Sequence, residues 1–314
     1  MKANSKISLV LLNWNGHEDS VECLNSLQNL NYDNFDIYLV DNNSQPESVE
    51  YIKSYLQRSS YTYDVKEKCE LDGYIKPDSV DVLFILNDEN SGFACGNNVA
   101  LNYILATKNT DYVLLLNNDT TVKPNLLSEM ISEYVKYPDT GFMGVKHYYY
   151  HEPGKIQTIG GGLVDKTHGE AMAIREPGVT DVYDFITGSC ILMSFEVLET
   201  VGVMYCDYFM YWEDVDWSAT AREYGYKLRI CDRTSIYHKE GASIKSLKRI
   251  YYHTRNRIWY MKRHSSRNIY YKFLIYIVLY VMKESVMNIA KNTQYSKILI
   301  KALIDGLRNK KRII

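Results

Sequence analysis

The feature that most constrains this chain is a short apolar run, residues 112–116, that stops abruptly at Asn117-Asn118-Asp119. A run this short and apolar is typical of a strand buried on both faces, as in a parallel sheet. In open α/β sheets, ligands bind just past the carboxyl ends of the strands. Oxygen atoms there suit Mg²⁺ or Mn²⁺ held together with the phosphates of a substrate. The simpler alternative is a turn whose side chains bond only their own backbone.

Strand-like and helical segments alternate through the first part of the chain. Strands are expected at 7–12, 35–40, 82–86 and 112–116, with helices at 18–30, 47–57 and 96–107. This alternation predicts βαβ units and an α/β fold with a mostly parallel central sheet. Polar loops follow three of these strands, which predicts a composite ligand site along one sheet edge. Beyond residue 145 the pattern loosens, with strand-like pieces at 185–193, 228–230 and 235–238.

A second acidic cluster, Glu213-Asp214-Val215-Asp216, lies in an aromatic frame that runs from Tyr211 to Trp217. Such a cluster can be no more than the acidic first turn of a helix, which the helix macrodipole stabilises. A metal site combined with a separate carboxylate is, however, what chemistry on a phosphate leaving group needs.

The net charge of −2 conceals two halves of opposite sign. Residues 1–238 hold 18 Lys and Arg against 35 Asp and Glu, a net −17, whereas residues 239–314 hold 18 against 3, a net +15. A basic carboxyl-terminal segment on an acidic body indicates an anionic partner such as membrane lipid, nucleic acid or a phosphate-rich substrate.

That segment contains ten apolar residues, 273–282, bracketed by Lys272 and Lys283. They fall short of the roughly 20 needed to span a bilayer. An amphipathic helix lying in a membrane interface fits the pattern, and a helix packed on the rest of the protein is the alternative. The basic run at 308–312 favours membrane contact.

Six cysteines are scattered without metal-binding spacing, and no signal peptide is recognisable at the amino terminus. All six are therefore expected to be reduced thiols in a cytosolic protein.

Six segments, taken in this order, closely resemble glycosyltransferase family 2, the inverting enzymes with the GT-A fold, over about residues 6–260. They are 12–16 (LNWNG), 40–44 (VDNNS), 90–98 (NSGFACGNN), 116–119 (LNND), 211–216 (YWEDVD) and 238–243 (HKEGAS). Within the family, the Asn-Trp-Asn-Gly opening and the Arg255-Asn256 pair are most similar to the rhamnosyltransferase-type branch, which builds bacterial surface polysaccharides.

The resemblance implies roles for individual residues. Donor contacts are expected from Asn13, Trp14, Asn15, Asp41, Asn90, Asn97, Asn118 and Arg255. Metal contacts to Mn²⁺ or Mg²⁺ are expected from Asn117, Asp119 and His238. Acceptor contacts are expected from Gly188, Ser189, Trp212 and Asp216, and catalytic roles from Asp214, as the base, and Glu213. Two departures stand out: Asn117 replaces the first Asp of the family's D-x-D motif, and Tyr205-Cys206 replaces its usual Asp-Glu.

The resemblance also implies an organisation and a function. Residues 1–262 are expected to form the catalytic domain, with 1–119 as the nucleotide-sugar half and 120–262 as the acceptor half, followed by an amphipathic basic helical tail at 263–314. The expected donor is a dTDP- or UDP-sugar, with rhamnose as first choice. The expected acceptor is a glycan, free or linked to polyprenyl pyrophosphate, and no nucleic acid is expected as a partner. A cytoplasmic protein peripheral to the inner membrane would fit this chemistry.

Two alternatives are weighed against this function. A sugar-nucleotide pyrophosphorylase would need a Gly-rich, basic loop after the first strand, but residues 13–19 carry one Gly and two acids. An inactive, transferase-like scaffold or membrane-binding protein would leave Asp119 and Asp214 without a role.

Overall fold

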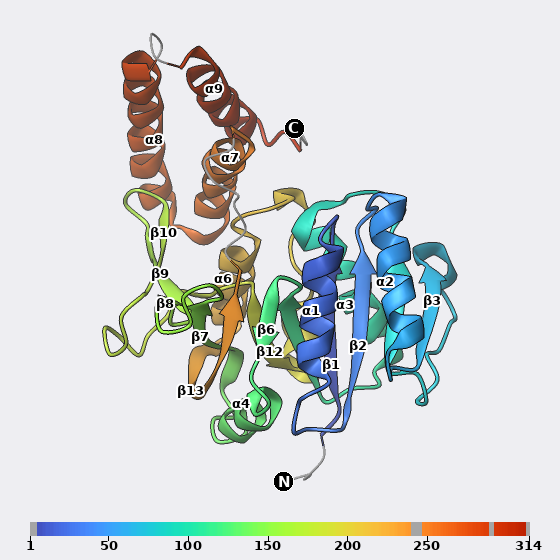
Figure 1. The fold of residues 1–314 in the computed structure, drawn as a ribbon. Helices are drawn as coiled ribbons and strands as arrows, with labels where there is room; N and C mark the ends of the chain where they lie inside the picture. Colours follow the sequence, from blue (N-terminus) through green and yellow to red (C-terminus); the bar gives the residue numbers. More distant parts are fainter. Residues whose placement is uncertain (1–4, 240–246, 289–291, 312–314) are drawn as a thin grey trace.

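The computed structural model describes residues 5–239, 247–288 and 292–311 (Figure 1). Its main sheet has the strand order β3-β4-β2-β1-β5-β12-β7-β13-β6, and β8 pairs with β7 at its side. The strands β1 (Ile7–Asn13), β2 (Phe35–Asp41), β3 (Tyr63–Glu67), β4 (Val82–Leu86) and β5 (Tyr112–Asn117) run parallel to one another. This confirms the predicted α/β fold with a mostly parallel sheet.

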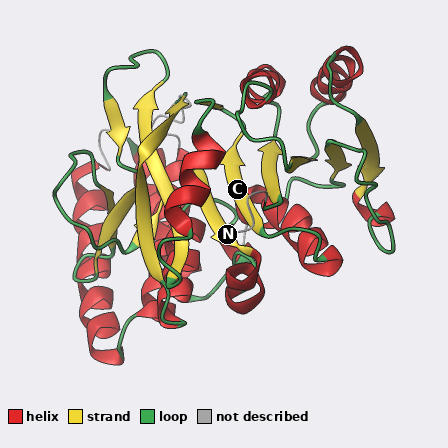
Figure 2. Cartoon of the chain, turned by 90° about the horizontal axis from the view of Figure 1, so that it is seen from below, coloured by secondary structure: helices red, strands yellow, loops and turns green. Residues whose placement is uncertain are grey.

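The helices α1 (His17–Leu27), α2 (Pro46–Arg58) and α3 (Gly92–Thr107) connect these strands and cover both faces of the sheet (Figure 2). The predicted strands and helices of this part are confirmed to within a few residues. The edge strand β3 was not predicted, because its sequence, YDVKE, is polar and only partly buried. An edge strand needs no long apolar run, so periodicity gives little signal for it.

The second part of the chain extends the sheet with antiparallel and parallel strands. Its elements in the main sheet are β6 (Thr120–Val122), β7 (Thr140–Tyr149), β8 (Ile156–Thr158), β12 (Cys190–Ser194) and β13 (Lys227–His238). Three short strands, β9 (Gly161–Asp165), β10 (Glu170–Ala173) and β11 (Phe185–Ile186), form a separate sheet. The helices here are α4 (Leu126–Tyr134), α5 (Phe195–Val201) and α6 (Glu213–Glu223).

Three predicted strand pieces differ from the structure. The run 185–193 splits into β11 and β12, which belong to different sheets, because the chain turns at 187–189. The pieces 228–230 and 235–238 are parts of one strand, β13, whose pairing with β7 shifts register between Cys231 and Ser235.

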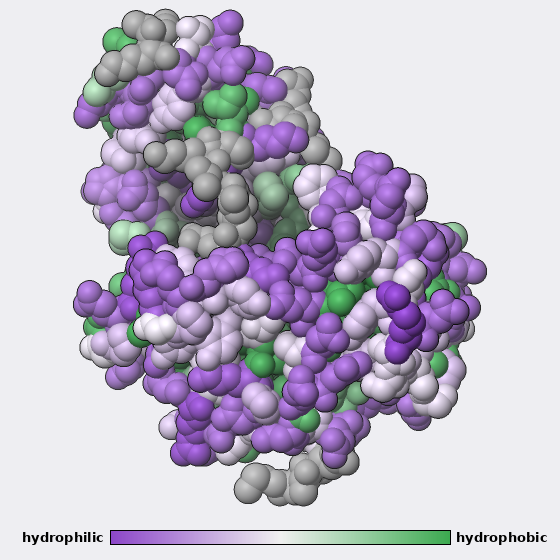
Figure 3. All heavy atoms as spheres, in the orientation of Figure 1, coloured by the Kyte–Doolittle hydropathy of each residue, from purple (hydrophilic) through white to green (hydrophobic). Residues whose placement is uncertain are grey.

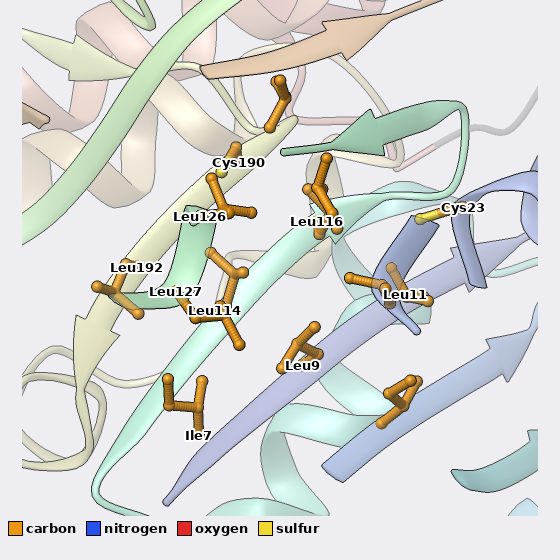
Figure 4. Packing of buried hydrophobic residues seen from close by; sticks show 14 of the residues in the cluster. Ile7, Leu9, Leu11, Cys23, Leu114, Leu116, Leu126, Leu127, Cys190 and Leu192 are labelled. Atoms are coloured by element: carbon orange, nitrogen blue, oxygen red, sulfur yellow. The ribbon is translucent and has the colours of Figure 1, made fainter. Parts of the chain in front are cut away.

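Alternation along β1 divides the core into two layers. Ile7, Leu9 and Leu11 face one layer together with Leu114 and Leu116 of β5 and side chains of α1 and α4 (Figure 4). Val10, Val113 and Leu115 face the other layer, against α3. Both faces of the central strands are thus buried, as their uninterrupted apolar sequences require.

Three helices end the chain: α7 (Leu247–His264), α8 (Arg267–Asn288) and α9 (Thr293–Leu307). They stand at one end of the molecule, beyond the sheet (Figure 1). Phe273, Ile277 and Val281 of α8 are buried in a cluster with residues of α7 and α9. No helix in the described part of the chain is both long enough and apolar enough to cross a membrane.

The opposite side of α8 is exposed. Its large apolar side chains that face solvent include Tyr271, Ile275, Leu279, Met282 and Val286. Their spacing of three or four residues places them on one stripe of the helix. The face of the body seen in Figure 3 is by contrast mainly hydrophilic.

Candidate active site

Three strand ends meet around the buried side chain of Asn13. Its amide nitrogen donates to Asp41 Oδ2 at 2.6 Å and to the Ser44 and Ser48 hydroxyls at 3.2 Å. Its oxygen accepts from Gly16 N at 3.1 Å and from the Ser20 hydroxyl at 2.9 Å. The polar loops after these strands therefore meet at one edge of the sheet, as predicted. The side chain of Asn13 uses its hydrogen bonds to hold these loops together.

Several side chains predicted to contact the donor make internal hydrogen bonds. Asn13 and Asp41 are buried, and Asp41 Oδ1 also accepts from Ser44 N at 2.8 Å. Asn118 donates to Ser20 Oγ at 2.8 Å, and Asn97 is buried and donates to the carbonyl of Phe93 at 2.9 Å. These hydrogen bonds shape the loops at the sheet edge, and the donor contacts of the four residues stay predictions.

Other predicted donor residues remain at the surface of the edge. Trp14 is 55% exposed, and Asn15 adopts a positive φ of 53° directly after it. Asn90 accepts from Asn42 Nδ2 at 3.1 Å and from Gly92 N at 3.0 Å, which fixes the start of α3. An exposed indole beside this edge is suited to stacking on a planar ring.

The structure brings together Asp119, in the turn after β5, and His238, at the end of β13. His238 Nδ1 donates to Gln157 Oε1 at 2.7 Å, and its Nε2 lies 3.2 Å from Asp119 Oδ1. Asp119 Oδ1 is buried and makes no hydrogen bond. Two electron-rich atoms this close need a proton or a metal ion between them.

This donor set fits a divalent ion that also takes ligands from a substrate, because Mg²⁺ and Mn²⁺ accept carboxylate and phosphate oxygens. The described residues contain no group of three or more His, Cys, Asp or Glu side chains that could hold a metal alone. Asn117, the third predicted ligand, lies partly buried at the end of β5. Residues 240–243 of the HKEGAS segment lie outside the described residues.

The turn at 187–189 connects the end of β5, next to Asp119 and His238, with the acidic cluster at the start of α6. Gly188 N donates to Asp214 Oδ2 at 2.8 Å, and Ser189 O accepts from Asn117 N at 3.0 Å. A Cβ atom on Gly188 would lie 3.3 Å from Cβ of Asp214, so the absence of a side chain allows this approach. Two predicted acceptor residues therefore connect the predicted base with the end of β5.

His147 lies behind this turn and was not predicted. Its Nδ1 donates to the carbonyl of Val145 at 2.8 Å, so its Nε2 accepts from the Ser189 hydroxyl at 2.6 Å. Burial and the nearby His238 ring lower the pKa of His147 to about 3, which keeps it neutral. A lone His within an apolar strand gives no sequence signal for such a role.

Glu213 and Asp214 begin α6 and differ in their surroundings. Burial, followed by the charges of Asp214 and Asp216, raises the pKa of Glu213 well above its usual range, and its Oε2 is buried without a hydrogen-bond partner. Burial also raises the pKa of Asp214, but N–H groups of Gly188 and Val215 at 2.8 and 2.9 Å oppose the shift. Asp214 is therefore the member of the pair that carries the negative charge.

The loop before α6 has an unusual backbone. Phe209, Tyr211 and Trp212 have φ angles of 65°, 65° and 79°, a region that L-residues rarely adopt and that costs energy to maintain. Phe93 N donates to the carbonyl of Phe209 at 2.6 Å. Gly92 makes this contact possible, since a Cβ there would lie 2.2 Å from that carbonyl oxygen.

Arg255 and Asn256 of α7 hold the same loop from the other side. Asn256 Nδ2 donates to the carbonyls of Tyr208, Met210 and Tyr211 at 3.0, 2.8 and 2.8 Å. The buried guanidinium of Arg255 donates to the carbonyls of Asp207 and Tyr208 at 3.2 and 2.9 Å. Arg255 therefore positions the loop that leads to Asp214, and its predicted contact with the donor stays a prediction.

Two further residues that were predicted to contact the acceptor, Asp216 and Trp212, are buried in the protein. Asp216 is buried and accepts from Tyr208 Oη at 2.8 Å, from Arg263 Nε at 2.7 Å and from His264 Nε2 at 2.8 Å. Burial alone would raise the pKa of Asp216, but the hydrogen bonds and charges of His264 and Arg263 bring it below its usual range. Asp216 is therefore satisfied by internal partners, and its predicted acceptor contact stays a prediction. Trp212 is buried, 5% exposed, on the wall of a cavity beside α7.

The expectation that all six cysteines are reduced is also wrong. Cys95 of α3 and Cys206 form a disulfide across 111 residues, with Cα atoms 4.8 Å apart. Cys23, Cys69, Cys190 and Cys231 are free. Only the packing of α3 against the loop that precedes α6 brings the two sulfur atoms together, so spacing alone could not reveal the pair. The bond anchors the beginning of that loop.

Comparisons with known proteins agree with this geometry. A family model described as glycosyl transferase family 2 matches residues 8–202. The low-salt glycan biosynthesis hexosyltransferase Agl10 of Haloferax volcanii is 24% identical over 185 residues, 56% of this chain and 59% of that protein. The chain thus matches about three-fifths of that relative's length.

Solved structures show the same fold at low identity. The mannosyltransferase PcManGT of Pyrobaculum calidifontis, in complex with GDP-Man and Mn²⁺, has a TM-score of 0.61 at 10% identity, covering 98% of this chain and 89% of that one. S. aureus TarS 1–349 in complex with UDP-GlcNAc has a TM-score of 0.55 at 14% identity, covering 96% and 81%. The fold is therefore that of the GT-A glycosyltransferases.

Proposed function

Because the chain belongs to glycosyl transferase family 2, we propose that it transfers a sugar from a nucleotide-diphosphate donor to a hydroxyl of a glycan acceptor, with inversion. One observation carries the proposal: the 187–189 turn holds Asp214 on one side and contacts the end of β5, next to Asp119, on the other. A proton acceptor and a site for diphosphate charge thus converge on one short segment.

In this reaction Asp214 takes the proton of the acceptor hydroxyl. The acceptor oxygen bonds to the anomeric carbon while the bond from that carbon to the diphosphate oxygen breaks, and the nucleoside diphosphate leaves with the electron pair. Partial burial makes Asp214 a stronger base than an exposed carboxylate. Gly188 N keeps Oδ2 oriented, and neutral His147 orients the Ser189 hydroxyl beside it.

Asp119 and His238 would hold a divalent ion, with Asn117 as a further oxygen ligand. Such an ion, when bound, offsets the charge that develops on the leaving diphosphate. Structures similar to this chain are solved with Mn²⁺ and GDP-Man, and others with UDP or UDP-GlcNAc, which supports a nucleotide-sugar donor.

The finer assignments follow from the sequence resemblance. Rhamnose is the first candidate for the transferred sugar, carried by dTDP or UDP, and a bacterial surface polysaccharide is the first candidate for the product. In this proposal residues 1–119 supply the donor side and residues 120–262 the acceptor side, with 263–314 as the tail.

We further propose that the tail contacts an anionic lipid surface. The apolar stripe on α8 is unpartnered in the described structure, Lys272 and Lys283 are exposed on the same helix, and residues 239–314 carry a net +15. Ile275→Glu combined with Leu279→Glu should abolish sedimentation with anionic vesicles, while Ile75→Glu, on a distant loop, should not. Unchanged sedimentation of the double variant would exclude α8 as the contact. The cytoplasmic localisation stays a prediction.

Calorimetric titration of the full chain with UDP, dTDP and GDP, each with and without Mn²⁺, tests the main proposal. We expect one nucleotide to bind only with the metal and to lose that binding in Asp119→Ala, with Asp181→Ala as the matched control. A folded protein that binds none of the three would contradict a transferase function and favour the scaffold alternative.

A further inference from the structure

A cavity of about 390 Å³ lies between the β9–β10 hairpin and the three carboxyl-terminal helices. Its walls include Met172 of β10, Tyr280 of α8, and Tyr295 and Leu299 of α9. Trp212, the residue directly before Glu213 and Asp214, also lines it. The cavity therefore adjoins the acidic cluster but lies outside the network that surrounds Asp119.

A row of basic side chains from α7 lines one side of this cavity. Arg249, His253 and Arg257 all contribute to the wall. They are spaced by four residues, so they project from the same face of the helix. The positive charges of Arg249 and Arg257, together with burial as the larger cause, lower the pKa of His253 to about 4. The two guanidinium groups thus share one environment with the imidazole between them.

Arg257 is unusual for a buried arginine. It is 9% exposed, its guanidinium lies 5.1 Å from the centre of the Tyr280 ring, and its Nε has no hydrogen-bond partner. Among the described residues, no carboxylate lies within salt-bridge distance of it; Glu170 lines the cavity but is exposed. Buried charges are normally paired, because an unpaired one loses hydration without compensation. An anion in the cavity would supply the missing partner.

We propose that this cavity binds the phosphate or pyrophosphate group of the acceptor. The inference rests on the proposed function and names its acceptor class: a phosphate ester whose sugar reaches Asp214 past Trp212. Guanidinium groups bind phosphate oxygens through paired hydrogen bonds, and a neutral imidazole can donate one more. The aromatic and aliphatic wall from Tyr280, Tyr295 and Leu299 suits a hydrocarbon chain next to the phosphate, as in a polyisoprenyl pyrophosphate.

The test uses the full chain saturated with the nucleotide and Mn²⁺, so that the donor position is occupied. Farnesyl pyrophosphate, inorganic pyrophosphate and farnesol are then titrated by calorimetry. Both pyrophosphates should bind and farnesol should not, since the row of basic groups selects the anion. Tighter binding of farnesyl pyrophosphate than of inorganic pyrophosphate identifies a lipid-linked acceptor, and equal binding identifies a phosphorylated acceptor without lipid.

Arg257→Gln should weaken pyrophosphate binding about tenfold or more and leave nucleotide binding unchanged. Arg249→Gln should also weaken pyrophosphate binding. Because Arg249 is exposed, this variant should fold normally even if Arg257→Gln, at a buried position, does not. Arg58→Gln, on exposed α2, is the matched control. Pyrophosphate affinity that is the same in both cavity variants and in the control would overturn the inference. A wild-type chain that binds pyrophosphate but no nucleotide would instead overturn the proposed function.

Discussion

Asn256 donates its side-chain amide to the carbonyl of Tyr211 at 2.8 Å, across 45 residues of sequence. Tyr211 is one of three residues in the loop before α6 that have a positive φ. The bond is one of three from the same amide nitrogen to this loop. A backbone of this kind persists only where its surroundings hold it, so the position of Asp214 depends on α7.

Asn256→Ala removes all three hydrogen bonds and leaves buried carbonyls unsatisfied. At about 1 kcal/mol for each bond, we expect a loss of about 2 to 4 kcal/mol in the free energy of unfolding. The turnover number should fall more than nucleotide affinity, because the base is displaced and the donor side is not. Urea denaturation and steady-state kinetics measure the two effects. The control is Asn29→Ala, at an exposed site where the side chain makes only a local hydrogen bond, and it should leave stability and turnover nearly unchanged. Equal losses in both variants would refute the role of Asn256.

Asp214→Asn should lower turnover by about 10²- to 10⁴-fold, the usual contribution of a general base. The amide oxygen can still accept from Gly188 N, and only the bond from Val215 N is lost, so the fold and the donor affinity should be retained. Single-turnover assays together with calorimetric nucleotide titration separate these quantities. Asp181→Asn is the exposed control. Reduced nucleotide affinity in Asp214→Asn would show that Asp214 belongs to the donor site.

Glu213→Gln should stabilise the protein in a pH-dependent way. The folded-state pKa of Glu213 is raised by burial, so its favourable contribution is complete below the unfolded-state pKa and is lost as pH rises through the folded-state pKa. Glutamine stays neutral, so the variant should melt above the wild type at neutral and alkaline pH, by about 2 to 4 °C for each kcal/mol. The difference should vanish near pH 4. A difference independent of pH would contradict this, and Glu196→Gln, in the exposed first turn of α5, is the control.

Breaking the Cys95–Cys206 disulfide should loosen the loop before α6. Cys95→Ser combined with Cys206→Ser is expected to cost about 2 to 4 kcal/mol of stability. Turnover should fall while nucleotide affinity changes little, since the bond anchors the loop on the base side. Dithiothreitol should reproduce the effect in the wild type and have none in the double variant. Cys69→Ser, at the exposed free thiol, is the matched control, and a wild type insensitive to reduction would argue against the anchoring role.

The parts of the fold that the sequence predicted are those set by local patterns. The apolar runs of β1, β2, β4 and β5 and the polar loops after them are each contained in a few neighbouring residues. Their meeting at one edge follows because parallel strands present their carboxyl ends together. The edge strand β3 has no such pattern, and the joining of two short pieces into β13 depends on its pairing with β7.

The surroundings of individual side chains could not be predicted, because a motif gives the residue but not its direction. Asn13 and Trp14 are neighbours, yet Asn13 is buried in a hydrogen-bond network and Trp14 is 55% exposed. Arg255 and Arg257 lie two residues apart on α7, so they face different sides: Arg255 holds a loop and Arg257 lines a cavity. Local spacing shows that the two differ, but only tertiary packing shows what each one meets.

Helix α7 therefore makes two sets of contacts, one with the loop before α6 and one with the cavity. Asn256 donates to the loop that leads to Asp214, while Arg249, His253 and Arg257 line the cavity, and the His253 ring also stacks on Tyr211 of that loop. A ligand in the cavity would contact the same helix that holds this loop, without contacting Asp214 itself. An acceptor bound in the cavity, as proposed above, would thus be linked through α7 to the loop that positions Asp214.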